Sequence, residues 1–197
     1  LIIVHGDRVE ALAGATVGAL NNVLTGHIEG GEVSGTIDEL IRHAVTKLSH
    51  SHFVANEEAQ HRLFQLGEKT ESTFVIGSPD IDVMNSDLLP SISEVKTRYE
   101  IDFNEYGSVI FHPVTTELED LQTHTKILVN TLIDSKKNYV VIYPNNDNGS
   151  EIIFNAFKRF KNNNKFRVFP SMRFEYFLQL LKYASFMIGN SSAGVRE

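Results

Sequence analysis

Acidic side chains follow two apolar runs near the start of the sequence, where they could act as acids or bases. Asp7 follows the run 1–4, and Glu29 follows the run 25–28 within His-Ile-Glu-Gly-Gly-Glu. Asp38 lies near the start of a predicted helix, where an aspartate also complements the helix dipole. Carboxylates that converge near an anionic substrate are typical of proton transfer. The alternative for Glu29 is an ordinary polar loop, and spacing alone leaves both interpretations open.

A small-residue segment near the end of the sequence could bind phosphate. Residues 189–194, Gly-Asn-Ser-Ser-Ala-Gly, follow an apolar run and precede a predicted helix start. The free N–H groups of such a start favour anions, and the hydroxyls of Ser191 and Ser192 can donate to phosphate oxygens. The same serines could act only as a helix N-cap, and the spacing does not choose between the two. The segment lacks the Gly-Lys-Ser/Thr ending of a P-loop.

Basic side chains also lie near these segments. A protonated His112, which follows another apolar run, could pair with a phosphate, although a lone histidine more often bonds a backbone carbonyl. Arg8, next to Asp7, is a further basic residue that could contact an anionic substrate. Arg42 stands four residues after Asp38, which is the spacing of a plain surface salt bridge on a helix. That salt bridge is the simpler interpretation of the Asp38–Arg42 pair.

Short apolar runs alternate with amphipathic stretches along most of the chain. Runs rich in Val, Ile and Phe that are separated by helices indicate βαβ units and parallel sheets, so we predict an α/β fold. The predicted strands are residues 1–4, 25–28, 52–55, 73–76, 108–112, 139–143, 166–169 and 186–188. The predicted helices are residues 9–22, 38–48, 57–66, 92–99, 117–134, 151–160 and 173–184.

The stretch 77–105 is less regular and contains Gly-Ser-Pro and Leu-Pro, which are typical of a domain boundary. We therefore predict two domains, 1–78 and 79–197, each with its own parallel sheet. The polar, glycine-rich segments fall where the predicted strands end. In such folds a ligand binds at the carboxyl ends of the strands, so a cleft between the two halves is the expected site.

Composition limits the classes of function. The net charge of -7 argues against a nucleic-acid-binding surface, and the lack of cysteine excludes disulfides and cysteine-based zinc sites. His50 and His52 lack a third ligand at metal-site spacing, so no metal is predicted. No apolar run reaches the length of a bilayer span and neither end resembles a signal peptide, so we expect a cytoplasmic protein without a membrane partner. The apolar start without an initiator methionine suggests a piece of a longer protein.

Five ordered motifs resemble the hydrolysing UDP-N-acetylglucosamine 2-epimerases of sialic-acid pathways, including the epimerase half of the bifunctional animal enzyme. The motifs are His-Gly-Asp-Arg at 5–8, His-Ile-Glu-Gly-Gly-Glu-Val-Ser-Gly-Thr-Ile-Asp-Glu at 27–39, Ile-Arg-His-Ala at 41–44, His-Pro-Val-Thr-Thr at 112–116 and Gly-Asn-Ser-Ser-Ala-Gly-Val-Arg-Glu at 189–197. The resemblance implies two Rossmann-like domains of the GT-B type, both truncated here, with UDP bound between them. It implies that Asp7, Glu29 and Asp38 are the catalytic carboxylates. It further implies that the UDP-binding residues are His112, Ser191, Ser192 and Glu197, with Arg8, Arg42 and Asn190 as weaker candidates.

The family eliminates UDP to form a glycal and then adds water to give N-acetylmannosamine, without net oxidation, so no cofactor is expected. The substrate implied is UDP-N-acetylglucosamine, and family members are commonly homo-oligomers. Alternatives are a non-hydrolysing epimerase, a relative acting on a diacetamido-trideoxy sugar nucleotide, a non-catalytic sugar-nucleotide-binding module, and a GT-B glycosyltransferase. The run Glu-Gly-Gly-Glu-Val-Ser-Gly-Thr favours the hydrolysing type, and retention of three carboxylates disfavours a pure binding module.

Overall fold

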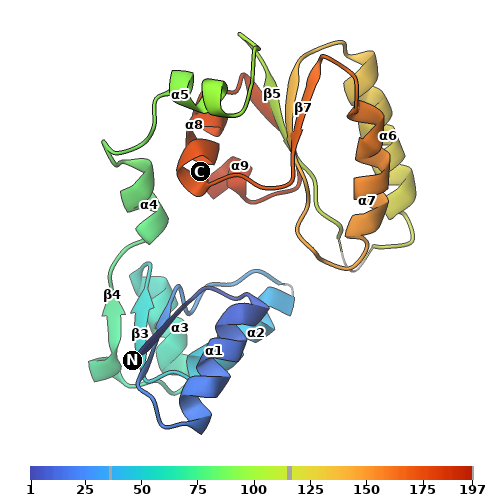
Figure 1. Ribbon diagram of the computed structural model, residues 1–197. Helices are drawn as coiled ribbons and strands as arrows, with labels where there is room; N and C mark the ends of the chain where they lie inside the picture. Colours follow the sequence, from blue (N-terminus) through green and yellow to red (C-terminus); the bar gives the residue numbers. More distant parts are fainter. Residues whose placement is uncertain (36, 115–116, 197) are drawn as a thin grey trace. The chain divides into compact units, whose positions relative to one another are not determined.

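The computed structural model describes residues 1–35, 37–114 and 117–196, with only the backbone of Arg196 (Figure 1). It divides into two compact units, Leu1–Asp82 and Val83–Glu197. Each unit has a parallel sheet of four strands, which confirms the predicted α/β class. None of the described helices is long and apolar enough to cross a membrane.

The first unit has a sheet whose strand order follows the chain. Its strands are β1 (Ile2–His5), β2 (Thr25–Ile28), β3 (Ser51–Val54) and β4 (Thr73–Val75), all parallel. The connections between them contain α1 (Val9–Leu20), α2 (Ile37–Lys47), α3 (Glu57–Gln65) and the 3₁₀ turn η1 (Thr70–Ser72). A short helix, α4 (Pro79–Met84), follows the last strand.

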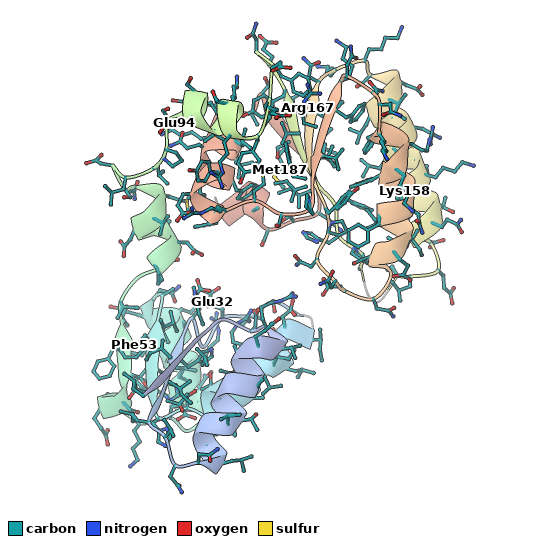
Figure 2. All side chains as sticks on the ribbon, in the orientation of Figure 1. Glu32, Phe53, Glu94, Lys158, Arg167 and Met187 are labelled. Carbon is teal, nitrogen blue, oxygen red and sulfur yellow. The ribbon has the colours of Figure 1, made fainter. Side chains whose placement is uncertain are left out.

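Side chains of alternating strand positions put the core of the first unit on one face of its sheet. Val4 of β1 packs with Ala11 and Ala15 of α1 and Val45 of α2, and Val54 of β3 packs with α3. The other face carries larger side chains that remain more accessible: Ile3 is exposed, and the ring of Phe53 stacks on that of exposed Phe74. Phe53 is labelled in Figure 2. The buried face is the one that supports the loops described below.

The second unit has strand order β7-β6-β5-β8, with all strands parallel. The strands are β5 (Gly107–Ile110), β6 (Tyr139–Ile142), β7 (Phe166–Phe169) and β8 (Phe186–Gly189). The helices are α5 (Ile92–Arg98), α6 (Leu121–Asp134), α7 (Ser150–Phe157) with the 3₁₀ turn η2 (Lys158–Phe160), α8 (Phe174–Lys182) and α9 (Ala193–Arg196).

Both faces of this second sheet are covered, as expected for parallel strands joined by helices (Figure 1). Val109 and Val141 pack against α6, α7 and η2, in a cluster that includes the stacked rings of Phe160 and Phe166. Val140 packs on the opposite face against α5 and α8. β5 lies between β6 and β8 in this sheet, so the loop that follows it starts from a strand that is paired on both sides.

Most predicted elements are present, with ends that shift by one or two residues. The helix predicted at 117–134 begins at Leu121, because the N–H groups of Glu117 and Leu121 close successive tight turns onto Val114 and Leu118. No helix was predicted where α4 lies. Pro79 at its first position was an available signal, since proline is favoured where a helix needs no N–H donor.

Candidate active site

Asp7 lies at the carboxyl edge of the first sheet and is held by a buried arginine. It follows β1, and its carboxylate accepts a hydrogen bond from Nη2 of Arg42 on α2. The Arg42 side chain is 8% exposed and that of Asp7 is 24% exposed. The predicted surface salt bridge is therefore wrong for Arg42, because burial on the sheet side of α2 directs its guanidinium at the loop after β1. A guanidinium removed from water needs such a partner.

Glu29 lies at the same edge, because β1 and β2 are neighbours in the sheet and His5 pairs with Ile28. Its carboxylate Oε2 is 3.1 Å from Nε2 of His5, and its side chain is 13% exposed. The backbone of Glu29 has φ 66°, a left-handed conformation that non-glycine residues adopt at a cost. The sheet fixes this conformation, since the N–H of Glu29 donates to the carbonyl of Phe53 on β3.

The loop that follows Glu29 is fastened to two helices through its carbonyl groups. Nη1 of Arg42 donates to the carbonyl of Glu32 at 2.8 Å, and Nη1 of Arg62 on α3 donates to the carbonyl of Gly31 at 2.9 Å. Gly31 has φ +80°, and a Cβ there would lie 2.3 Å from the carbonyl oxygen of Ala59. The glycine is required because the loop backbone touches the backbone of α3.

The other predicted residues of this edge have different environments. Asp38 lies in the first turn of α2, half-buried, one turn before Arg42 on the same side of the helix. Its neighbour Glu39 instead accepts hydrogen bonds from the N–H groups of Ser34 and Gly35, both at 2.8 Å. Those N–H groups lower the pKa of the Glu39 carboxyl, which fits a structural cap rather than a proton carrier. Arg8 is exposed at the N-cap of α1.

Sequence reasoning missed His27, which supports the edge from inside the sheet. It is fully buried on β2, with Nε2 2.9 Å from the carbonyl of Gly6 and Nδ1 3.0 Å from the hydroxyl of Thr46. A carbonyl only accepts, so Nε2 donates and Nδ1 accepts from Thr46. Burial lowers the pKa of His27 to about 4, which keeps the ring neutral. Its place on the core face of a buried strand was the available signal.

The corresponding edge of the second sheet carries His112, after β5, and Asn190, after β8. The side-chain oxygen of Asn190 accepts from the N–H of His112 at 2.8 Å, and its Nδ2 donates to the carbonyl of His112 at 2.9 Å. Nδ1 of the His112 ring accepts from the N–H of Asn145, after β6, at 3.4 Å. Residues that follow β6 and β8 therefore hold His112, Asn190 by its main chain and Asn145 by its ring.

The serines at this edge are not equivalent. Oγ of Ser191 accepts from the N–H of Ala193, two residues further on, at 3.3 Å, which closes a serine turn just before α9. Ser192 is exposed in the turn before that helix. Glu197 lies outside the described residues. The edge thus offers hydroxyl and N–H donors, which suit an anionic ligand.

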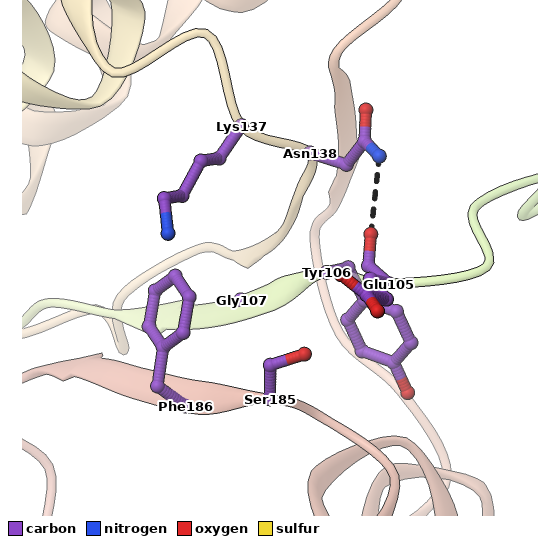
Figure 3. Close-up of a pocket in the computed structure, with 7 residues that line it drawn as sticks. All are labelled: Glu105, Tyr106, Gly107, Lys137, Asn138, Ser185 and Phe186. Carbon is purple, nitrogen blue, oxygen red and sulfur yellow. Dashed lines mark hydrogen bonds between the residues drawn. The ribbon is translucent and has the colours of Figure 1, made fainter.

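Among the described residues no group of three His, Cys, Asp or Glu side chains could hold a metal ion. An open hollow in the second unit lies at the opposite, amino-terminal end of its strands (Figure 3). There Lys137 lies over the ring of Phe186, 5.3 Å from its centroid, and Asn138 donates to the carbonyl of Glu105 at 3.1 Å. Parallel sheets bind ligands at the carboxyl ends of their strands, so this hollow is not a candidate active site.

Comparison with known proteins agrees with the observed α/β fold. The family described as UDP-N-acetylglucosamine 2-epimerase matches residues 1–197. The chain belongs to this epimerase family. A UDP-N-acetylglucosamine 2-epimerase of Neisseria meningitidis serogroup B is 54% identical over 197 residues, which is all of this chain and 52% of that protein. A hydrolysing UDP-N,N'-diacetylbacillosamine 2-epimerase of Legionella pneumophila is 32% identical over 206 aligned residues, covering all of this chain and 52% of that protein.

Among solved structures of this epimerase family, the UDP-GlcNAc 2-epimerase of Methanocaldococcus jannaschii in complex with UDP-GlcNAc and UDP resembles the chain with a TM-score of 0.71. That alignment covers 96% of this chain and 54% of the other at 20% sequence identity, a level that shows the fold alone. The chain spans about half the length of the curated relatives that it matches.

Proposed function

We propose that the whole protein is a hydrolysing UDP-N-acetylglucosamine 2-epimerase that converts UDP-N-acetylglucosamine and water into N-acetylmannosamine and UDP for sialic acid synthesis. The observation that carries the proposal is the carboxyl edge of the first sheet. There Asp7 is held by buried Arg42, and Glu29 sits in a left-handed conformation against His5. A binding surface does not require strained and buried support for two acidic groups, whereas proton transfer requires fixed ones.

The chemistry has two steps. Elimination breaks the bond from C1 to the UDP oxygen and removes the proton at C2, which leaves a glycal and UDP. Hydration then adds a proton at C2 from the other face and hydroxide from water at C1. One carboxylate can stabilise the positive charge that develops at C1 while another accepts or returns the C2 proton. We assign these tasks to Asp7, Glu29 and Asp38.

The second sheet supplies groups that suit the leaving nucleotide. We assign the diphosphate to Ser191 and Ser192 and stabilisation of its charge to His112. We assign the ribose hydroxyls to Glu197, which lies outside the described residues. The exposed Ser192 hydroxyl and the fixed His112 ring support these roles, since preorganised donors stabilise charge without moving. Arg8, beside Asp7, is a further candidate for contact with the substrate.

Hydrolysis rather than simple epimerisation is favoured by the run Glu-Gly-Gly-Glu-Val-Ser-Gly-Thr at 29–36 and by the Legionella pneumophila relative, whose name specifies hydrolysis. That relative acts on a diacetylbacillosamine nucleotide, which makes this sugar nucleotide the second candidate substrate.

The test is to incubate the whole protein with UDP-N-acetylglucosamine and identify the products. Equal amounts of UDP and free N-acetylmannosamine are expected. UDP-N-acetylmannosamine as the stable product would contradict hydrolysis. A much higher kcat/KM for UDP-N,N'-diacetylbacillosamine would contradict the assigned sugar, and tight UDP binding without turnover would indicate a binding module.

A further inference from the structure

We propose that Asn190 is a positioning residue that acts on the nucleotide only through His112, by clamping its main chain to the end of β8. This inference rests on the proposed function, because it concerns the UDP-binding edge. It differs from the direct contact that the family resemblance suggests for Asn190.

The first observation is the geometry of the clamp. The Asn190 amide uses its oxygen to accept from the N–H of His112 and its nitrogen to donate to the carbonyl of the same residue, at 2.8 and 2.9 Å. A pair of bonds to both main-chain groups of one residue is what a neighbouring strand provides in a sheet. The parallel register pairs Ile110 with Gly189, so the Asn190 side chain extends the β5–β8 ladder beyond its last backbone pair.

A second observation explains why a side chain, rather than the backbone of β8, bonds the main chain of His112. Gly189 has φ +149°, and a Cβ there would lie 1.7 Å from the carbonyl oxygen of Ile110. The two backbones touch at Gly189, where β8 ends, and the chain then enters the turn before α9. Among short side chains only asparagine carries both a donor and an acceptor at this reach, since aspartate lacks the donor and serine is shorter.

The third observation concerns the imidazole ring of His112, whose main chain Asn190 holds. The ring of His112 accepts at Nδ1 from the N–H of Asn145, so its proton is on Nε2. The main chain of His112 is thus fixed by the residue after β8, and its ring by the residue after β6. Releasing the main chain would move the ring away from the Asn145 N–H and let both tautomers form.

The experiment is a double-mutant cycle on UDP affinity, measured by calorimetry with the whole protein. Asn190→Ala is expected to weaken UDP binding about tenfold in the unchanged background, and by less than about twofold when His112→Ala is already present. Asn138→Ala is the matched control: this half-buried asparagine also bonds a backbone carbonyl, at the opposite end of the same sheet, and UDP affinity should stay unchanged. If Asn190→Ala does not fold, the same cycle is measured with Asn190→Ser, which keeps a polar side chain but lacks the amide.

An equal loss of affinity in both backgrounds would overturn the inference, because it would mean that Asn190 touches the nucleotide itself. A second readout needs no ligand: the ring ¹⁵N signals of His112 should show the Nε2–H tautomer and become a mixture in Asn190→Ala but not in Asn138→Ala. If the unchanged protein bound no UDP, the proposed function would fail, and these ring signals alone would decide the clamp. Unaltered signals in Asn190→Ala would overturn it.

Discussion

Arg42 shows how one buried charge organises the acidic edge of the first sheet. Its guanidinium donates to the Asp7 carboxylate, to the carbonyl of Glu32 at 2.8 Å and to the hydroxyl of Ser34 at 3.4 Å. These acceptors belong to the loops after β1 and β2, so a single side chain on α2 ties both to one helix. A planar guanidinium has enough N–H donors in fixed directions for all three acceptors, whereas the ammonium of a lysine is a single compact charge that cannot reach them together.

Replacing Arg42 should therefore reduce both stability and turnover. In Arg42→Lys we expect a loss of about 2 to 3 kcal/mol in the free energy of unfolding, because carbonyl and carboxylate acceptors lose their partner in a site that water enters poorly. We also expect a fall in kcat, because Asp7 is no longer held. Urea unfolding and steady-state kinetics measure the two effects.

Arg159→Lys is the control, since Arg159 is exposed and its Nη1 donates to the side-chain oxygen of Asn130 rather than to a loop of the acidic edge. It should change stability by less than about 0.5 kcal/mol. Wild-type stability and turnover in Arg42→Lys would show that the guanidinium has no special role.

His27 should make stability depend on pH in a defined window. Burial lowers its pKa from 6.5 to about 4. Between these values the unfolded chain holds a proton that the folded chain does not, so stability is full above pH 6.5 and falls as the pH drops towards 4. The shift corresponds to roughly 3 kcal/mol across that window.

The variant His27→Gln has no titrating ring and keeps a donor for the carbonyl of Gly6. Its free energy of unfolding should fall less steeply between pH 6.5 and 4 than that of the unchanged protein. The residual slope contains the contribution of His52, whose pKa burial also lowers. Identical slopes in the two proteins would refute the buried neutral state of His27.

At the scale of elements, the loops depend on contacts with helices as much as on their own strands. The segment after β2 is pinned by α2 through Arg42 and by α3 through Arg62 and Gly31. A sheet edge with such fastened loops can hold catalytic groups in place without spending binding energy on ordering them.

A comparison of Gly31 with Gly67 separates the effect of close backbone approach from the effect of a left-handed backbone conformation. Both have positive φ, but a Cβ at Gly31 would lie 2.3 Å from a backbone oxygen, whereas a Cβ at Gly67 meets nothing within 4 Å. Gly67→Ala should cost about 1 kcal/mol for its left-handed backbone. Gly31→Ala should cost more than about 2 kcal/mol, since α3 and the loop must separate, and it should lower kcat as Glu29 moves. Thermal unfolding of the two variants tests this order, and equal losses would contradict it.

At the scale of the whole molecule, the proposal divides the work between two units with separate cores. Changes at the first edge should affect the chemical step, and changes at the second should affect the nucleotide. Each unit buries its own apolar cluster, so a surface change in one is not expected to unfold the other.

Asp7→Asn and Ser192→Ala test this division. We expect Asp7→Asn to abolish turnover while UDP binding survives, because the amide cannot serve as a base or as a counter-charge. We expect Ser192→Ala to weaken UDP binding by about 1 kcal/mol or more through loss of a hydrogen bond to a charged oxygen. Calorimetry with UDP and a product assay measure both. Normal turnover in Asp7→Asn would refute its catalytic role.

The sequence by itself determined the class of fold, the strands and the sheet edges, because apolar periodicity and turn residues are local signals. It predicted β2 and β7 with their observed bounds and identified the loops that carry Asp7 and Glu29. The family likeness added chemical roles that spacing alone left open. Those roles for the site residues remain predictions.

Only the tertiary structure decided which side chains support these loops. The spacing of Arg42 from Asp38 predicted a surface salt bridge between them. In the structure Arg42 is buried on the sheet side of α2 and forms its ion pair with Asp7. His27 stood in the motif at 27–39 without an assigned role, and Asn190 gave no sign that its amide serves the main chain of His112, 78 residues away. Local pattern encodes which face of an element is apolar, but it does not encode which distant backbone group a buried donor will meet when the elements pack.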